Sequence, residues 1–538
     1  MNAAFARRAA RYLEASGAHH RRRAAELDGL VGEPALKEEC GVFGVIGTPD
    51  AATLTALGIH ALQHRGQEAA GITSAELDTK VFHSERYLGL VSDHFSDAAT
   101  LARLKGSAAI GHTRYSTQGD TVIRNVQPLY ADLDKTGFAV AHNGNLTNSL
   151  KLRSELIREG CIFQSTSDSE LFLQLTARAR QPSIVEKLVE ALKQVEGAFA
   201  LVVLTHNALI GVRDPVGIRP LVLGRLGDAP ILASETCALD LIGATYVRDV
   251  NPGEIVICSA DGKIESRQVF PLPEKARLCI FELIYFAKPS SIVGGRSVYQ
   301  VRKRLGEALA RQAPCDVDFV SPIPDSGVPA AIGYAQASKL PYEMALIRSH
   351  FIGRTFIEPQ QKIRESGVRR KHAPNKPLIE GKRVVLIDDS VVRGTTSRSI
   401  TQMLRGAGAK EVHMRIACPP IIHPDFYGID TPSQEELYAS TRTIEEMRKE
   451  IGVDSLAFLS LEGLYEALGG GPRDDAAPAF TDHCFTGDYP TRLVDRDDAD
   501  RSAMIKTASS CPIAFMAPPL KFCFNPAAAH GGDVVRFD

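Results

Sequence analysis

The stretch "RVVLIDDSVVRGTTS", residues 383–397, constrains the fold of this chain more than any other segment. Its apolar run "VVLI" is typical of a buried strand, and the run ends in two adjacent acids, Asp388 and Asp389. A polar loop follows, and after the loop the pattern predicts a helix. The same order of apolar strand, polar turn and helix occurs at 317–340. Repeated units of this kind predict a parallel sheet with ligands at the carboxyl ends of its strands.

The loop after the acids has the composition of a phosphate site. Backbone N–H groups ahead of a helix form a nest for a phosphate dianion, and Gly394 lets the backbone approach it closely. The hydroxyls of Thr395 and Thr396 add donors. Paired acids here make sense if they hold ribose hydroxyls or a Mg²⁺ ion. The alternative is a charged turn at a strand end, which does not explain Arg393-Gly-Thr-Thr at this spacing.

The first half of the chain has a different order of predicted strands and helices. From Cys40 to about Arg267 short strand-like runs are frequent, and helical patterns intervene at 51–63, 147–159, 168–180 and 183–195. This pattern predicts layered α+β packing. A proline-broken segment marks a linker near residue 270. We therefore expect domains at 40–270 and 271–470, preceded by a leader at 1–39 and followed by a largely irregular extension at 471–538.

Composition excludes several classes of protein. The 538 residues are 44% hydrophobic and 23% charged with a net charge of −2, which is typical of a soluble globular protein and not of a nucleic-acid binder. The longest apolar stretch, 197–212, is too short and too polar to span a bilayer. The ten cysteines form no CxxC pair, which favours reduced thiols in the cytoplasm. The Arg-rich leader leaves an organelle transit peptide as the alternative location.

Cys40 stands directly before an apolar run, in "KEECGVFGVIG". As a lone cysteine it could be a core residue. If the preceding peptide bond were cleaved, however, its own α-amino group, with a pKa near 7.7 to 8.0, could take the proton of the thiol. Nucleophile and base would then belong to one residue.

Four further residues suit a site for an amino-acid amide. The guanidinium of Arg114 can hold a carboxylate, Asn143 and the N–H of Gly144 can stabilise an oxyanion, and Asp168 can bind an amino group. Each has an ordinary alternative, such as a surface ion pair, a turn or a helix N-terminal charge.

Taken in order, five motifs carry a resemblance that the single residues do not. They are "CGVFG", "LQHRGQEAAG", "GHTRYST", "AHNGNL" and "STSDSE". They resemble the glutamine-amidotransferase domain of the N-terminal-nucleophile hydrolases, over about residues 40–250. The acid-pair loop resembles the phosphoribosyl-diphosphate (PRPP) loop of the type I phosphoribosyltransferases. The two together, with "GRTFIEP" and "CFTGDYP", resemble the amidophosphoribosyltransferase family over about residues 38–490.

The resemblance implies an αββα sandwich followed by an α/β domain with a parallel sheet. It implies that a pro-segment, 1–39, is removed and that Cys40 releases ammonia from glutamine, with Asn143 and Gly144 forming the oxyanion hole. Arg114 and Asp168 would hold the glutamine, and Arg65 would help to order the site. Ammonia would then displace pyrophosphate from PRPP and give 5-phosphoribosylamine, the first committed step of purine biosynthesis.

For the second domain the resemblance implies that residues from Val391 to Thr396, Arg393 among them, bind the phosphate. It implies that Ser326, Asp388 and Asp389 bind Mg²⁺, and that Arg354 lies in a loop that closes over PRPP. Feedback inhibition by purine nucleotides and a homotetramer are further family properties.

Many members of the family, those whose sequences most resemble this one, carry a [4Fe–4S] cluster on four cysteines. The resemblance assigns two of these positions to Cys237 and Cys484, but Asp425 and Thr481 stand at the other two. Clusters require thiolates, so we expect no intact cluster, although another cysteine such as Cys418 could replace a ligand.

Two other functions remain open. A PRPP-sensing regulator would have the second domain's fold but no need for the first domain's candidate residues. Another glutamine amidotransferase would lack the PRPP loop or would carry an SGGxDS motif, which is absent from the sequence.

Overall fold

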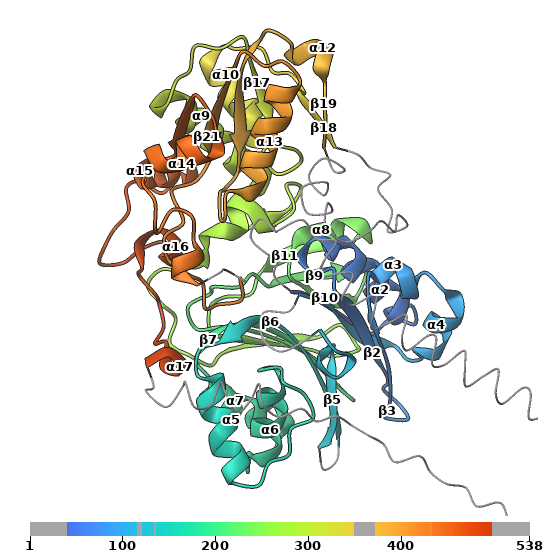
Figure 1. Ribbon diagram of the computed structural model, residues 1–538. Helices are drawn as coiled ribbons and strands as arrows, with labels where there is room; N and C mark the ends of the chain where they lie inside the picture. Colours follow the sequence, from blue (N-terminus) through green and yellow to red (C-terminus); the bar gives the residue numbers. More distant parts are fainter. Residues whose placement is uncertain are drawn as a thin grey trace, which may run out of the picture. The chain divides into compact units, whose positions relative to one another are not determined.

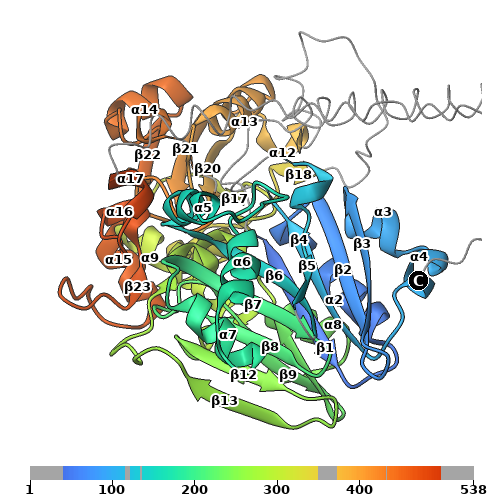
Figure 2. The same ribbon diagram turned by 90° about the horizontal axis from the view of Figure 1, so that it is seen from below.

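The computed structural model describes residues 40–115, 121–133, 136–348, 372–429, 431 and 433–497. Its first half contains two antiparallel sheets (Figures 1 and 2). The larger has the order β11-β9-β10-β1-β4-β2-β3, with β1 Gly41–Ile46, β2 Ala69–Glu76, β3 Val81–Leu88, β4 Ala108–Arg114, β9 Val222–Leu226, β10 Ala229–Ala233 and β11 Thr245–Asp249. The smaller has the order β13-β12-β8-β7-β6-β5, with β5 Leu129–Leu133, β6 Thr136–Leu146, β7 Gly197–Thr205, β8 Leu209–Arg213, β12 Glu254–Cys258 and β13 Ile264–Gln268.

The two sheets stack because their strands alternate between two buried surfaces. On β7, Val202 and Leu204 lie in the core between the sheets, whereas Leu201 and Val203 lie in the core beneath the helices. Space between the sheets is tight at Gly44 of β1, where a Cβ atom would come within 2.6 Å of Val202. Strands buried on both faces explain why these segments are apolar runs rather than alternating ones.

Helices cover the outer face of each sheet. The larger sheet carries α2 Ala51–Ala61, α3 Val91–Phe95, α4 Ala98–Arg103 and α8 Thr236–Leu241. The smaller carries α5 Ser149–Arg158, α6 Glu170–Arg178 and α7 Ile184–Leu192. Short 3₁₀ turns, η1 Gln63–Arg65 and η2 Ile123–Asn125, complete this half. The predicted αββα sandwich is confirmed, and the four helical patterns form α2, α5, α6 and α7.

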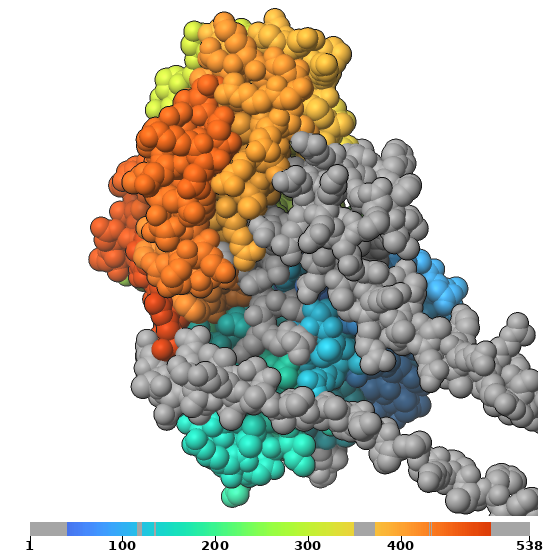
Figure 3. All heavy atoms as spheres, in the orientation of Figure 1, coloured from blue at the N-terminus to red at the C-terminus, as the bar shows by residue number. Residues whose placement is uncertain are grey.

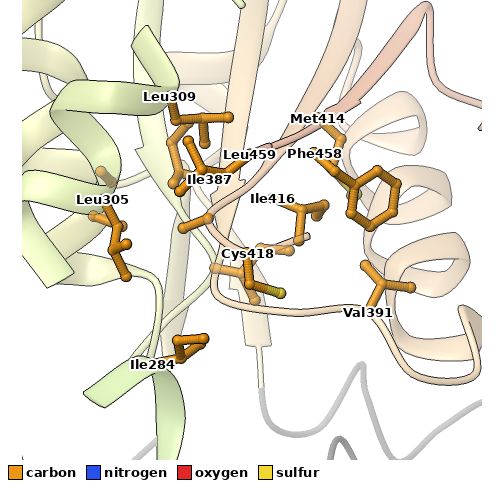
Figure 4. Packing of buried hydrophobic residues seen from close by; sticks show 14 of the residues in the cluster. Ile284, Leu305, Leu309, Ile387, Val391, Met414, Ile416, Cys418, Phe458 and Leu459 are labelled. Atoms are coloured by element: carbon orange, nitrogen blue, oxygen red, sulfur yellow. The ribbon is translucent and has the colours of Figure 1, made fainter. Parts of the chain in front are cut away.

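The second half is built on a parallel sheet in the order β17-β20-β21-β22. Its strands are β17 Phe319–Pro322, β20 Arg383–Asp388, β21 Glu411–Ile416 and β22 Ser455–Phe458. The main helices are α9 Val298–Gln312, α10 Val328–Ser338, α13 Thr395–Gly406, α14 Ile444–Ile451 and α15 Leu461–Leu468. Figure 4 shows Leu305 and Leu309 of α9 near Ile387 of β20, in one buried cluster with Ile416 of β21. The predicted parallel α/β domain is confirmed.

Shorter elements surround this sheet. They are β14 Leu278–Cys279, the π-helical turn η3 Glu282–Phe286, β15 Ile292–Val293, β16 Arg296–Ser297, β18 Leu346–Arg348, β19 His372–Pro374, α12 Lys376–Ile379, η4 Gln434–Glu436, β23 Phe480–Thr481, α16 His483–Thr486 and α17 Val494–Asp497. In Figure 3 the segments from this half, coloured yellow to red, lie together on the surface. Within the part of the chain that the structure describes, no helix is long and apolar enough to cross a membrane.

The segment 471–497 is better packed than its composition indicates. We expected irregular structure there, yet β23 pairs in parallel with β14, and Phe480, Cys484 and Phe485 lie in the core of the second half. The backbone N–H groups of Ile422 and His423 both donate to the carbonyl of Cys484. Long-range pairing therefore orders a segment whose local propensities are weak.

Candidate active sites

Cys40 lies at the start of β1, between the ends of β4 and β10. The residue is 5% exposed, and its Sγ lies 3.5 Å from the carbonyl oxygen of Tyr115. Burial raises the pKa of the thiol, whereas the charge of Arg114 acts in the opposite direction. A thiol with a raised pKa is protonated at neutral pH, so attack by this residue requires a base beside it.

Arg114 and Asp168 approach this thiol from two different elements. Both are buried, Arg114 at the end of β4 and Asp168 just before α6, and both charges act on the pKa of Cys40. The carboxylate of Asp168 accepts a hydrogen bond of 3.0 Å from the backbone N–H of Leu146. A cation and an anion on either side of a thiol match the carboxylate and ammonium ends of an amino acid.

Asn143 and Gly144 lie near the end of β6 and are both buried. Neither polar atom of the Asn143 side chain has a hydrogen-bond partner among the residues that the structure describes. Gly144 has φ of +135°, and a Cβ atom there would lie 2.1 Å from the carbonyl oxygen of Ala198. An unpartnered buried amide is costly and is usually retained for a ligand, here a developing oxyanion.

His142, which was not predicted from the sequence, contacts Asp168 through the hydroxyl of Ser169, which donates to Asp168 Oδ1 at 3.4 Å. Its Nδ1 lies 3.9 Å from Asp168 and 3.0 Å from the hydroxyl of Ser169. Burial lowers the pKa of His142, so the imidazole is neutral. The sequence does carry a signal for this contact. His142 directly precedes Asn143 in "AHNGN", and Ser169 directly follows Asp168 in "STSDSE", so both adjoin residues that were predicted for the site.

Arg65 lies beneath Cys40 and is fully engaged by protein groups. Its Nε donates to the carbonyl of Cys40 at 3.1 Å, and its other nitrogens contact Glu235 at 2.6 Å and Glu282 at 2.6 Å and 2.9 Å. Burial alone would lower the pKa of this guanidinium, but Glu282 and Glu235 raise it well above its usual value. The geometry gives Arg65 an ordering role at the nucleophile, and neither glutamate could be paired with it from the sequence.

The predicted phosphate loop connects β20 to α13. Gly394 precedes α13 with φ of +73°, and a Cβ atom there would lie 2.7 Å from the ring of Tyr438. Val391 is buried, Arg393 lies 3.9 Å from Glu436, and α13 begins at Thr395 and Thr396. The helix is twelve residues long, and its first N–H groups lack helical acceptors and can bind phosphate. Arg354 lies outside the described residues.

Asp388 and Asp389 are buried together at the carboxyl end of β20. The hydroxyl of Ser390 donates to Asp389 at 2.6 Å, and Ser326 also forms a hydrogen bond with it. Burial raises the pKa of both carboxyls, and the charge of Asp389 raises that of Asp388 further. Two carboxylates and a hydroxyl offer the hard oxygen ligands that Mg²⁺ prefers, and a cation would relieve their repulsion. These residues therefore fit Mg²⁺.

The structure separates the two cysteines assigned to an iron–sulfur remnant. The thiol of Cys237 lies near Ala61 and Glu235, in a group with His64, whereas Cys484 lies in a second group. The assignment of Cys237 is therefore wrong. The assignment of Cys237 rested on the resemblance of its motif alone. In the structure the pairing of β14 with β23 places Cys279 opposite Thr481, close to Cys484.

The residues near Cys484 do not fit a [4Fe–4S] cluster. The hydroxyl of Thr481 donates to the carbonyl of Arg277 at 2.6 Å, and Asp425 is in contact with His483 at 2.8 Å. Among the described residues, Cys484 is the one thiol in the group with Asp425 and His483, and a cubane cluster takes four cysteine thiolates. Cys418, the possible replacement ligand, instead lies near the acid pair: burial raises the pKa of its thiol, and the charges of Asp389 and Asp388 raise it further.

Comparisons with known proteins agree with this division. Residues 112–241 match a glutamine amidotransferase domain, and residues 292–424 match a phosphoribosyl transferase domain. An amidophosphoribosyltransferase of Rhizobium etli is 58% identical over 466 residues, which cover 86% of this chain and 94% of that protein. A chloroplastic one of Glycine max is 51% identical over 456 residues, 84% of this chain and 78% of that protein.

A solved structure is similar along both halves. It is the glutamine PRPP amidotransferase from Bacillus subtilis complexed with ADP and GMP, with a TM-score of 0.79 and 45% identity. The match covers 84% of this chain and 98% of that one. With the two sites, the two domains, a relative that is 58% identical over 94% of its length and a solved structure matched over 98% of its chain, the protein belongs to the amidophosphoribosyltransferase family.

Proposed function

We propose that this chain hydrolyses glutamine in its first domain and transfers the ammonia to PRPP in its second, giving 5-phosphoribosylamine, glutamate and pyrophosphate. One observation carries the proposal: a buried thiol near Arg114 and Asp168, and a buried Asn143 whose amide has no partner among the described residues, occur in the same chain as an acid-pair phosphate loop. The reaction is the first committed step of purine biosynthesis.

In the first domain the Cys40 thiolate attacks the side-chain amide carbon of glutamine. The oxyanion receives hydrogen bonds from the amide of Asn143 and the N–H of Gly144. The α-ammonium group of Cys40 returns the thiol's proton to the leaving nitrogen as the C–N bond breaks and ammonia leaves. Water then hydrolyses the thioester to glutamate and the free thiol. Arg114 and Asp168 bind the two charged ends of the substrate, and Arg65 holds the nucleophile through its carbonyl oxygen.

In the second domain the loop from Val391 to Thr396 binds the 5′-phosphate, with Arg393 and Gly394 included. Ammonia attacks the anomeric carbon, and pyrophosphate leaves. Ser326, Asp388 and Asp389 would hold Mg²⁺, and the ion would supply positive charge for the pyrophosphate leaving group. Arg354 belongs to the segment that we propose closes over PRPP, which keeps ammonia from water.

Removal of residues 1–39 supplies the base in this scheme, because it converts the amide nitrogen of Cys40 into an α-amino group. The intact mass of the active protein should match a chain that begins at Cys40. An active chain that retains the leader would contradict this step, and a cut elsewhere in the leader would favour a targeting segment over the cytoplasmic location that we propose.

Purine nucleotides are the expected inhibitors, since a solved relative holds ADP and GMP. We propose a homotetramer with binding at the PRPP site and at a subunit contact. Adding AMP and GMP together should lower the rate more than either alone, and light scattering gives the oligomeric mass.

The test is release of glutamate from glutamine by the purified chain, with and without PRPP and Mg²⁺. We expect release that depends on PRPP, accompanied by an equal amount of pyrophosphate. A PRPP-sensing regulator would release no glutamate, and a sugar-phosphate amidotransferase would show no response to PRPP. Either result would reject the proposal.

A further inference from the structure

The place where the iron–sulfur cluster was considered holds a compact group of three different ligand types. Asp425 lies just after the 419–424 loop, and His483 and Cys484 lie on α16. Their exposed fractions are 8%, 1% and 1%. One ligand atom from each, a carboxylate oxygen, an imidazole nitrogen and a thiol sulfur, lies within 4.8 Å of the other two.

The three atoms contact one another through the imidazole of His483. His483 Nε2 lies 2.8 Å from Asp425 Oδ2 and 3.3 Å from the sulfur of Cys484. Apart from this ion-pair contact with His483, Asp425 Oδ2 has no partner among the described residues. Oδ1 of the same carboxylate is fully used, because it accepts the N–H groups of Tyr427 at 2.7 Å and Ile429 at 2.8 Å. The backbone thus fixes the carboxylate, and its Oδ2 faces the imidazole nitrogen of His483 and lies within 4.8 Å of the sulfur of Cys484.

A fourth donor lies close by on another strand. Cys279 of β14 is in register with Thr481 of β23, two residues before His483. The thiols of Cys279 and Cys484 are both buried, and both residues belong to the same core cluster. Thr481 itself is excluded as a donor, since its hydroxyl is bonded to the carbonyl of Arg277.

We propose that Asp425, His483 and Cys484, with Cys279 as the fourth ligand, bind a single zinc ion. Zinc takes this mixture of oxygen, nitrogen and sulfur in a tetrahedron, with bonds of about 2.0–2.3 Å. Such bonds separate neighbouring ligand atoms by about 3.3–3.8 Å, so small outward shifts from the observed contacts admit the ion. Magnesium prefers oxygen alone, and a cubane cluster requires thiolates at all four positions.

The site would have a structural role. It joins the 419–429 segment to α16, and the carbonyl of Tyr427 within that segment binds Arg219 of the first half at 2.7 Å. A closed set of four protein ligands leaves no open position for a substrate, which is typical of structural zinc. The inference concerns this chain's own ligands and is independent of the proposed reaction.

The direct test is metal analysis of the purified full chain after dialysis against a mild chelator. We expect about one zinc per chain, no acid-labile sulfide, and a lower melting temperature after a strong chelator removes the metal. Replacement by Co²⁺ should give intense visible bands of tetrahedral cobalt and a thiolate charge-transfer band. Iron and sulfide in about fourfold amounts, or metal-free protein whose chelator-treated form binds no added Zn²⁺ or Co²⁺, would overturn the proposal.

Variants separate the ligands from their surroundings. Asp425→Asn, His483→Gln and Cys484→Ser should each weaken zinc binding more than about 100-fold, because even second-shell changes typically cost 10–100-fold. Cys279→Ser should weaken it and remove part of the cobalt–thiolate band. Cys237→Ala, a buried thiol in the other group, is the matched control and should leave the zinc content unchanged. A folded Cys484→Ser protein with full zinc affinity would contradict the assignment. If Cys484→Ser does not fold, Cys279→Ser provides an independent test.

Discussion

At the residue scale, Asn143 and Asp388 share one property: each is buried in surroundings that become favourable when a ligand binds. The amide of Asn143 has no partner in the described structure, and the carboxyl of Asp388 lies beside that of Asp389. An unpaired buried amide costs about 1–3 kcal/mol. Both residues therefore lower stability in return for a function, and substitution should separate the two effects.

Asn143→Ala should lower the glutamine-dependent kcat about 100- to 1,000-fold, as loss of one oxyanion donor typically does. The rate with ammonia should be unchanged, because the second domain is untouched. Measuring product formation with each nitrogen source checks this, with Asn207→Ala in the loop between β7 and β8 as the control. An equal loss with ammonia would show that Asn143 acts through folding.

Asp388→Asn should abolish activity with both nitrogen sources while raising the melting temperature of the ligand-free protein. Burial and Asp389 raise the pKa of Asp388 in the folded state, so the folded protein binds more protons than the unfolded one. Stability therefore falls as the pH rises above the usual aspartate range, and the variant should have a flatter pH profile. Thermal unfolding from pH 4 to pH 8 measures this, and a destabilised variant at pH 8 would contradict it.

At the element scale, β20 and α13 were predictable because an apolar run, an acid pair and a Gly-Thr-Thr turn each specify local structure. The segments β14 and β23 were not, since each has two residues and is defined by pairing with a segment some 200 residues away. The misplaced Cys237 has the same cause. A motif indicates which residues resemble a family, whereas only tertiary pairing determines which thiols meet.

Gly394→Ala should raise the KM for PRPP and destabilise the protein by about 1–3 kcal/mol, because its φ is +73° and Tyr438 occupies the space of a Cβ atom. Gly406→Ala, at the other end of α13, is the matched control. No atom lies within 4 Å of the position that its Cβ atom would take, so helix propensity should stabilise it by about 0.5–1 kcal/mol. Urea unfolding and PRPP titration test both, and equal effects would contradict the role of the loop.

At the scale of the whole molecule, buried charges connect the two sites. Arg65 binds the carbonyl of Cys40 and the carboxylate of Glu282, which begins η3. Arg302 donates to the carbonyls of Leu283 at 3.1 Å and Ala287 at 2.7 Å, within η3 and directly after it, and its charge acts on Asp389. The turn η3 therefore contacts the supports of both the nucleophile and the acid pair.

PRPP should stimulate glutamine hydrolysis at least about tenfold less in Glu282→Gln than in the wild type. A tenfold change lies within the range of about 5- to 150-fold by which coupled sites typically affect each other. The ammonia-dependent rate should stay close to wild type. Glu254→Gln, a buried glutamate paired with Arg248, is the control. Comparing glutamate release with and without PRPP gives the coupling, and full stimulation in Glu282→Gln would show that η3 does not carry it.

The central claim is that one chain holds two separable active sites, and Cys40→Ala tests it most directly. Product formation from PRPP would be measured with glutamine and with ammonia, beside the wild type and Cys258→Ala. We predict that the variant loses at least about 1,000-fold with glutamine, since the nucleophile is gone, and keeps its rate with ammonia within about twofold. Equal loss with both nitrogen sources, or retained activity with glutamine, would contradict the account.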